Sequence, residues 1–162
     1  MVDTQNRTFK LKFPGDLEYI PSVRKFISEV LVASNFDAKF AYRSEIIVDE
    51  ICNNAVSYGC VRPDAAIDLA CTIFGDRIEF TIRDEGVKKD DIKQLELAVK
   101  SDPKAVPIDP LEGAGKKAAL GLEIVRMLSK DVTFEVDQNN LTSIRVVKVR
   151  EDEPGAPSQS AS

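Results

Sequence analysis

Hydrophobic and polar residues alternate over several short stretches of the chain, the spacing expected of β-strands with one buried and one exposed face. The first such stretch is residues 9–13. Alternation returns over 67–73 and 78–82, on either side of a Gly-Asp pair that is typical of a hairpin turn. Residues 132–136 and 144–146, separated by a polar segment with two asparagines, predict a second hairpin.

Apolar residues at helical spacing predict three amphipathic helices. The first covers about 19–34, and the second runs through 45–59 after a short joint at 35–37. Helical spacing reappears over 118–130, with Gly121 near the expected start of that helix.

This order of elements predicts an α+β domain, a two-layer α/β sandwich in which a mixed, mostly antiparallel sheet carries its helices on one face. The domain is expected to cover residues 1–150. Within it, residues 87–117 have no sustained periodicity apart from a candidate short helix over 91–100, and a connection of this length is typical of a lid. Residues 151–162 are acidic and then rich in proline and serine, so we expect a disordered tail.

Composition narrows the classes of function. The chain has 162 residues, 43% hydrophobic and 30% charged, and a net charge of −5, which argues against direct nucleic-acid binding. It contains no apolar run long enough to span a bilayer and no signal-peptide pattern at its start, so we expect a cytoplasmic protein that does not enter membranes. There is no histidine, which excludes a Ser-His-Asp triad and histidine-ligated zinc on this chain. Any general base must therefore be a carboxylate, lysine, tyrosine or cysteine.

Because the chain has no histidine, the polar pair Glu50 and Asn54 becomes a candidate for function. They lie four residues apart, so they share one helix face, and that face borders the apolar stripe of Ile47 and Ile51. A carboxylate and an amide at the edge of a core need polar partners, because burying them unpaired is costly. A bound ligand or metal would be such a partner. The alternative is a solvated edge of an ordinary core helix.

Three motifs in sequence order resemble the N, G1 and G2 boxes of the GHKL (Bergerat-fold) ATPases: Glu50-x-x-x-Asn54-Ala55, then Asp84-x-Gly86, then Gly121-Leu122 at a helix start. Within that superfamily the chain is most similar to the bacterial anti-sigma-factor serine/threonine kinases, over about residues 7–149. The resemblance implies the histidine-kinase-like ATPase fold, with ATP and Mg²⁺ as cofactors.

The resemblance also implies a role for each matching residue. Asn54 would coordinate the Mg²⁺ bound to ATP, for which an amide oxygen is a suitable hard ligand. Glu50 would be the general base that accepts the proton of a serine hydroxyl. Asp84 would accept a hydrogen bond from the adenine amino group, Gly86 would let the backbone turn near the base, and Thr142 would line the adenine pocket. Taken alone, the Asp-x-Gly motif is equally typical of a strand-end turn, and Thr142 of an exposed strand position.

The segment Ala119-Leu120-Gly121-Leu122 aligns with the phosphate-binding G2 box, in which backbone amides at a helix N-terminus hold the phosphates. Lys116 and Lys117 would add positive charge there, although a solvated lysine pair is the plain alternative. Two residues depart from the family pattern, since Ala119 and Lys88 stand where glycines are usual. These departures weaken the case for tight nucleotide binding more than the case for the fold.

The hypothesis is therefore an ATP-dependent protein serine/threonine kinase that also acts as an anti-sigma factor. The resemblance implies a sigma factor as one partner, a STAS-domain anti-sigma-factor antagonist as substrate, and a homodimer formed through the first strand and helix. The alternative is a non-catalytic module that sequesters a partner, with weak or absent nucleotide binding. A zinc or redox protein is disfavoured, because the spacing of Cys52, Cys60 and Cys71 is that of core residues.

Overall fold

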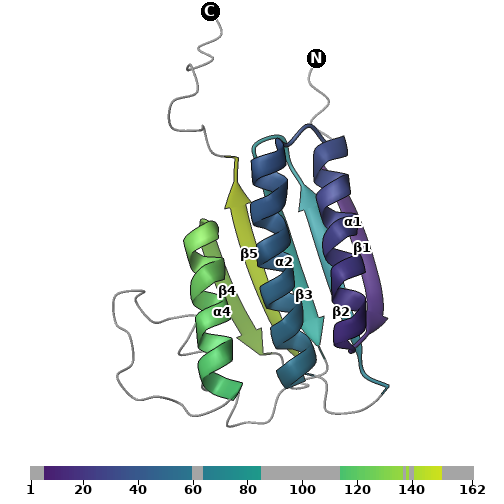
Figure 1. Ribbon diagram of the computed structural model, residues 1–162, viewed down its shortest axis with the longest axis vertical. Helices are drawn as coiled ribbons and strands as arrows, with labels where there is room; N and C mark the ends of the chain where they lie inside the picture. The colour runs from purple at the N-terminus through teal and green to yellow at the C-terminus, as the bar shows by residue number, and fades with distance from the viewer. Residues whose placement is uncertain (1–5, 60–63, 85–113, 137, 139–140, 151–162) are drawn as a thin grey trace, which may run out of the picture.

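The computed structural model describes residues 6–59, 64–84, 114–136, 138 and 141–150. In chain order its elements are β1 (Arg7–Pro14), a 3₁₀ turn η1 (Leu17–Tyr19), α1 (Ile20–Ala33), α2 (Ala38–Gly59), β2 (Ala66–Ile73), β3 (Arg77–Asp84), α4 (Ala114–Leu128), β4 (Asp131–Val136) and β5 (Thr142–Val149) (Figure 1). Helices and strands appear in the order predicted. The predicted lid over 87–117 lies mostly outside the described residues, as does the predicted tail.

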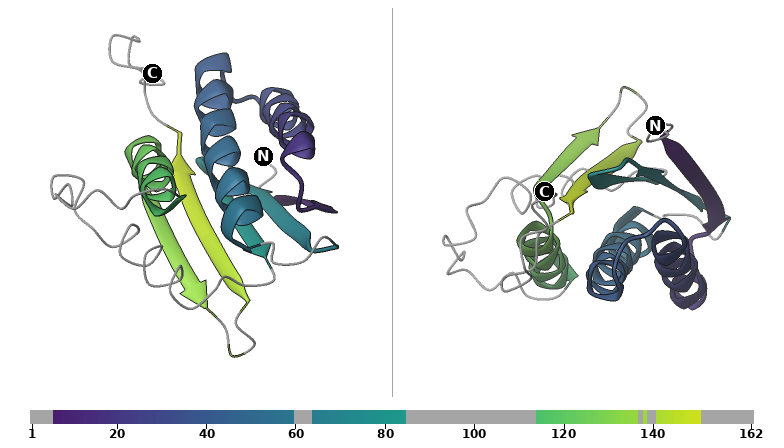
Figure 2. Two further views of the ribbon diagram at one scale, coloured as in Figure 1. Left: turned by 60° about the horizontal axis from the view of Figure 1, so that its bottom comes forward. Right: turned by 90° about the horizontal axis from the view of Figure 1, so that it is seen from above.

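The strands form a five-stranded sheet in the order β1-β2-β3-β5-β4, and every strand pair is antiparallel. Helices α1, α2 and α4 lie side by side on one face of this sheet, with α2 between the other two (Figure 2). The predicted two-layer α+β architecture with helices on one face is therefore confirmed.

Strand register explains which side chains enter the core. Leu69 lies opposite Ile82 and Cys71 opposite Phe80, so the alternating apolar residues of the two strands share the face beneath the helices. All four side chains are at most 1% exposed. The backbone N–H of Phe74 donates to the carbonyl of Arg77 at 2.9 Å, which closes the predicted turn.

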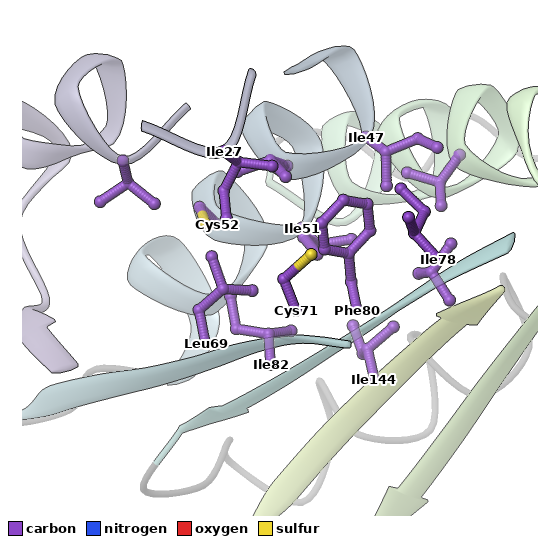
Figure 3. Close-up of a cluster of buried hydrophobic side chains, with 14 of the residues drawn as sticks. Ile27, Ile47, Ile51, Cys52, Leu69, Cys71, Ile78, Phe80, Ile82 and Ile144 are labelled. Atoms are coloured by element: carbon purple, nitrogen blue, oxygen red, sulfur yellow. The ribbon is translucent and has the colours of Figure 1, made fainter. Parts of the chain in front are cut away.

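The central helix α2 supplies most of the helical side of the core. Ile47, Ile51 and Cys52 are fully buried and pack toward Phe80 and its neighbours on the sheet (Figure 3). Burying an isoleucine or phenylalanine side chain contributes roughly 1.5–3 kcal/mol each. The helix begins where Asp37 accepts a hydrogen bond from the Phe40 N–H at 2.7 Å, the geometry of an N-cap. Packing of this face holds the neighbouring polar residues of α2 at the edge of the core.

Helix α4 begins earlier than its apolar spacing predicts. Its first residue is Ala114, four residues before the predicted start at Ala118. The residues added are one alanine, one glycine and two lysines; alanine and lysine are strong helix formers, and the four residues carry no apolar periodicity. Gly121 is consequently the eighth residue of the helix, counted from Ala114, and the prediction that Gly121 and Leu122 open the helix is wrong.

Candidate functional site

The polar pair on α2 lies at the boundary between core and surface, as its position beside the apolar stripe predicts. Asn54 is 7% exposed, and Glu50, one turn earlier, is partly buried. Both side chains lie on the side of α2 that approaches α4, since each comes close to Gly121 of that helix. The reading of this pair as a solvated helix edge does not describe Asn54.

Gly121 is the point at which α4 meets this pair. A Cβ atom built on Gly121 would overlap Oε2 of Glu50, and it would lie 3.3 Å from Glu50 Cδ and 3.8 Å from Asn54 Nδ2. Glycine at this position lets α4 lie against the two polar side chains without displacing them. Residues from the first and third motifs, far apart in the chain, are thus brought into contact.

Asn54 carries a polar atom whose hydrogen-bonding capacity is unused within the described part of the chain. Its Nδ2 is buried and has no hydrogen-bond partner there. Leaving such an atom unsatisfied costs about 1–3 kcal/mol, so its retention calls for a specific reason. A half-turn of the amide exchanges the positions of its nitrogen and oxygen, and the same location then offers an acceptor. An oxygen there is a suitable ligand for a hard cation.

The second motif pairs a carboxylate with a buried hydroxyl. Asp84 is the last residue of β3 and lies opposite Thr142, the first residue of β5. The Thr142 hydroxyl, 2% exposed, donates a short hydrogen bond to Oδ1 of Asp84. This bond holds the carboxylate in one orientation, and an ionised carboxylate is an acceptor toward any donor it meets.

The elements that carry these residues share one end of the domain. The C-terminal half of α2, the end of β3, the start of β5 and the N-terminal half of α4 all point to the same end (Figure 1). Asp84 ends β3 and Thr142 begins β5 at that end, whereas Glu50 and Gly121 lie near the middle of α2 and α4. The antiparallel β3–β5 pair places Thr142 beside Asp84, although the two residues are 58 positions apart along the chain.

Other predicted site residues are placed differently. Gly86 and Lys88 lie outside the described residues, and Lys116, Lys117 and Ala119 are described as part of the α4 backbone only. Two further residues of the G2 segment differ in exposure: Leu122 is fully buried in the core, and Leu120 is 53% exposed. Because α4 starts at Ala114, the amides of 119–122 lie beyond its first four N–H groups, in the helical hydrogen-bond ladder. The phosphate-binding role of this segment remains a prediction.

The cysteines that the structure describes are buried and unreactive. Burial raises the pKa of the Cys52 thiol from 9.0 to about 12, with the Asp49 carboxylate adding to the effect. Burial also raises the pKa of Cys71 to about 12. Among the described residues, no group of three or more histidine, cysteine, aspartate or glutamate side chains is arranged to hold a metal ion.

One buried charge was missed by the sequence analysis. Lys148 is 2% exposed on the face of β5 beneath the helices. The signal was present in the sequence, because Ile144, Val146 and Lys148 continue a single alternating series on one strand.

Comparison with known proteins identifies the domain. Residues 13–148 match the family described as the histidine kinase-like ATPase domain. The chain belongs to this family. The resemblance to the GHKL superfamily, first indicated by three short motifs, is thereby confirmed.

Two known proteins are similar to this chain. The serine-protein kinase RsbW of Bacillus cereus (strain AH187) is 24% identical over 129 residues, which are 80% of this chain and 78% of that protein. A chain in the crystal structure of the SiaB-SiaC complex from Pseudomonas aeruginosa has a TM-score of 0.65 at 18% identity, covering 86% of this chain and 88% of that chain. The structural likeness confirms the histidine-kinase-like ATPase fold.

The described residues suit the nucleotide that this family name implies. The buried amide nitrogen of Asn54 has no hydrogen-bond partner in the described part of the chain, and the missing side chain of Gly121 lets α4 approach Glu50 and Asn54. The oriented carboxylate of Asp84 provides an acceptor at the same end of the domain. Within the described part of the chain, no helix is long and apolar enough to cross a membrane.

Proposed function

We propose that this protein is an ATP-dependent serine/threonine protein kinase that acts as an anti-sigma factor and phosphorylates a STAS-domain antagonist. The observation that supports this most strongly is the contact of Glu50 and Asn54 with Gly121, together with the unsatisfied amide of Asn54. The similarity to a serine-protein kinase, together with the ATPase family of this chain, supports a hydroxyl side chain as the acceptor.

Nucleotide recognition is divided between two groups of residues. Asp84, held by the Thr142 hydroxyl, accepts a hydrogen bond from an amino group, which favours adenine over guanine at that edge. Asn54 would provide an amide oxygen to Mg²⁺, an ion that takes few protein ligands. Lys116 and Lys117 add positive charge toward the phosphates, and Gly86 lets the backbone pass close to the base. Bound Mg-ATP supplies the γ-phosphoryl group that is transferred.

Glu50 performs the proton transfer. Its carboxylate lies one helical turn from Asn54, and it accepts the proton of the attacking serine or threonine hydroxyl. Phosphoryl transfer depends mainly on positioning and charge neutralisation, so a single carboxylate beside the metal ligand is sufficient equipment. The chain has no histidine to compete for this role.

The proposed partners follow from the proposed role as an anti-sigma factor and kinase. The protein holds a sigma factor inactive, and the STAS-domain antagonist competes for it until phosphorylation releases the antagonist. We propose a homodimer and a cytoplasmic location for this cycle. The complex named in the SiaB-SiaC structure is consistent with a domain of this fold that works through a protein partner.

A phosphotransfer assay tests the proposal. The full chain is incubated with Mg-ATP and the STAS-domain protein encoded nearest to it, and phosphoserine or phosphothreonine is detected by mass spectrometry. Glu50→Gln is expected to reduce transfer by at least a hundredfold while nucleotide binding persists. Glu45→Gln, on the same helix but outside the motif, is the matched control and should transfer normally. Normal transfer by Glu50→Gln would remove the general base from the proposal.

A second candidate function is a partner-sequestering module without catalysis. Two features favour it: the amides of 119–122 lie within the helical ladder of α4, and Ala119 and Lys88 replace glycines. The melting temperature with and without Mg-ATP separates the two functions, because a ligand that binds only the folded state raises it. A rise with Mg-ATP and none with Mg-GTP supports the kinase, and no rise with either supports the module.

A further inference from the structure

Lys148 joins three elements of the domain at a single buried cation. It lies on β5 beneath the helices and is 2% exposed. Its Nζ donates a hydrogen bond of 2.8 Å to the backbone carbonyl of Leu128, and it lies 4.9 Å from the centroid of the Phe40 ring. Removing a lysine from water is costly, so a buried one is retained only with compensating interactions.

Each contact falls at a helix end. Leu128 is the last residue of α4, and its carbonyl is one of the four that a helix leaves without an internal partner. A cation at this position caps the helix and interacts favourably with the negative end of its dipole. Phe40 lies in the first turn of α2, and an ammonium over an aromatic face adds a cation–π attraction. Lys148 therefore ties the C-terminal end of α4 to the N-terminal end of α2.

The start of α2 and the end of α4 lie at the end of the domain opposite the end of β3 and the start of β5 (Figure 1). From Phe40 to Glu50 the rise along α2 is about 15 Å, and from Leu128 to Gly121 the rise along α4 is about 10 Å. Both helices are rigid over such lengths, so their relative position at Lys148 sets how Gly121 is placed against Glu50 and Asn54. Packed helices slide past one another by small shear movements, and a fixed point at one end limits that slide.

We propose that Lys148 is a positioning residue that sets the axial register of α4 against α2, and thereby holds Gly121 level with Glu50 and Asn54. The structural part of this proposal stands on the contacts of Lys148, and its effect on phosphotransfer rests on the proposed kinase function. Leu122 and Val125 of α4 are fully buried in the same apolar core as Ile47 and Ile51 of α2, and packing of this kind defines the depth of α4 more than its axial position.

The test compares three variants of the full chain. Lys148→Met keeps the length and apolar stem but removes the charge and the donor, and Lys148→Arg keeps both. Leu31→Ala, in the fully buried core of α1, is a control for loss of stability away from α4. Lys148→Gln is a milder second variant, read in the same way, if Lys148→Met does not fold.

Hydrogen exchange without nucleotide gives the first readout. In Lys148→Met we expect the amides of 122–128 to exchange at least tenfold faster than in the wild type, relative to those of β2 and β3. Lys148→Arg should restore protection, and Leu31→Ala should not expose α4 selectively. Unchanged exchange of the α4 amides in Lys148→Met would overturn the proposal.

Phosphotransfer at saturating Mg-ATP gives the second readout. We expect at least a tenfold lower rate in Lys148→Met and less than a twofold change in Leu31→Ala, with nucleotide affinity of the lysine variant altered less than its rate. An equal loss in both variants would overturn the positioning role. If the wild type transfers no phosphate, the kinase proposal fails by itself, and the exchange result still decides whether Lys148 sets the position of α4.

Discussion

Gly121→Ala separates the stability of the domain from its chemistry more cleanly than any other substitution. The new Cβ would overlap Oε2 of Glu50 and would lie 3.3 Å from Glu50 Cδ and 3.8 Å from Asn54 Nδ2. The atom that must move is the far end of a flexible side chain, so Glu50 is expected to swing away while α4 stays in place.

The gain in helix stability from Gly121→Ala and the cost of displacing the Glu50 side chain nearly cancel. Replacing a glycine inside a helix by alanine stabilises it by about 0.8–1.0 kcal/mol. Forcing a side chain such as that of Glu50 from its preferred rotamer costs about 0.5–1.5 kcal/mol. The free energy of unfolding should therefore change by less than about 1 kcal/mol. Phosphotransfer should fall by about a hundredfold or more, because the general base no longer reaches its position.

Urea unfolding and phosphotransfer, measured on the same preparations, check both halves of this prediction. Gly75→Ala is the control, because a Cβ at that turn would meet nothing within 4 Å. It should leave transfer unchanged. Normal transfer in Gly121→Ala would show that the contact with Glu50 is unimportant for the reaction. A loss of stability above about 3 kcal/mol would show that α4 itself is displaced, which the balance of the two effects does not allow.

Three further predictions concern single groups of the domain. Asn54→Ala should leave the nucleotide-free protein about as stable as the wild type, because it removes an unsatisfied buried amide. Calorimetry should nevertheless show Mg-ATP binding weakened at least tenfold, and the neighbouring Asn53→Ala is the control that should bind normally. Thr142→Val removes the hydroxyl that orients Asp84, so the ratio of ATP to GTP affinity should fall several-fold, and an unchanged ratio would contradict that role. Burial raises the pKa of Cys52 and Cys71 from 9.0 to about 12, so the folded protein holds these thiol protons more tightly than the unfolded chain. The resulting contribution to stability is full below pH 9 and should be lost as the pH rises from 9 toward 12. Urea unfolding as a function of pH, compared with a Cys52→Ala, Cys71→Ala double variant, measures this loss.

Local pattern was enough to predict most elements of the fold. The alternation over 67–73 and 78–82 indicates which side chains face the core, and pairing across a short turn then sets the register. The helix of Glu50 was equally clear, because its apolar residues keep helical spacing up to a terminal glycine. In each case neighbours along the chain carry the information.

The spacing of apolar residues along the chain predicts neither the strand order nor the start of α4. β5 lies between β3 and β4, a placement that pairs Asp84 with Thr142 across a long stretch of chain. The first residues of α4 form a helix through intrinsic propensity and carry no apolar stripe. Apolar spacing alone therefore predicts a start four residues after the observed one. Tertiary pairing decides the strand order, and helix propensity decides the start of α4.

The candidate site was predicted as separate motifs, and the structure brings some of them together. The sequence indicated Glu50 and Asn54 as a pair by helix geometry, but the approach of Gly121 to both side chains depends on the packing of α4 on α2. Lys148 was not predicted, because its polar character suggested an exposed residue despite its place in an inward series. Gly86 and Lys88 lie outside the described residues, and their roles stay predictions.

The central claim is that Glu50 and Asn54 face a site for magnesium-bound ATP. A crystal structure of the full chain with Mg²⁺ and a non-hydrolysable ATP analogue tests it most directly. The account predicts the Asn54 amide oxygen about 2.1 Å from the metal, with the adenine amino group hydrogen-bonded to Asp84. Clear density for the nucleotide away from these residues, or none at saturating analogue, would contradict it.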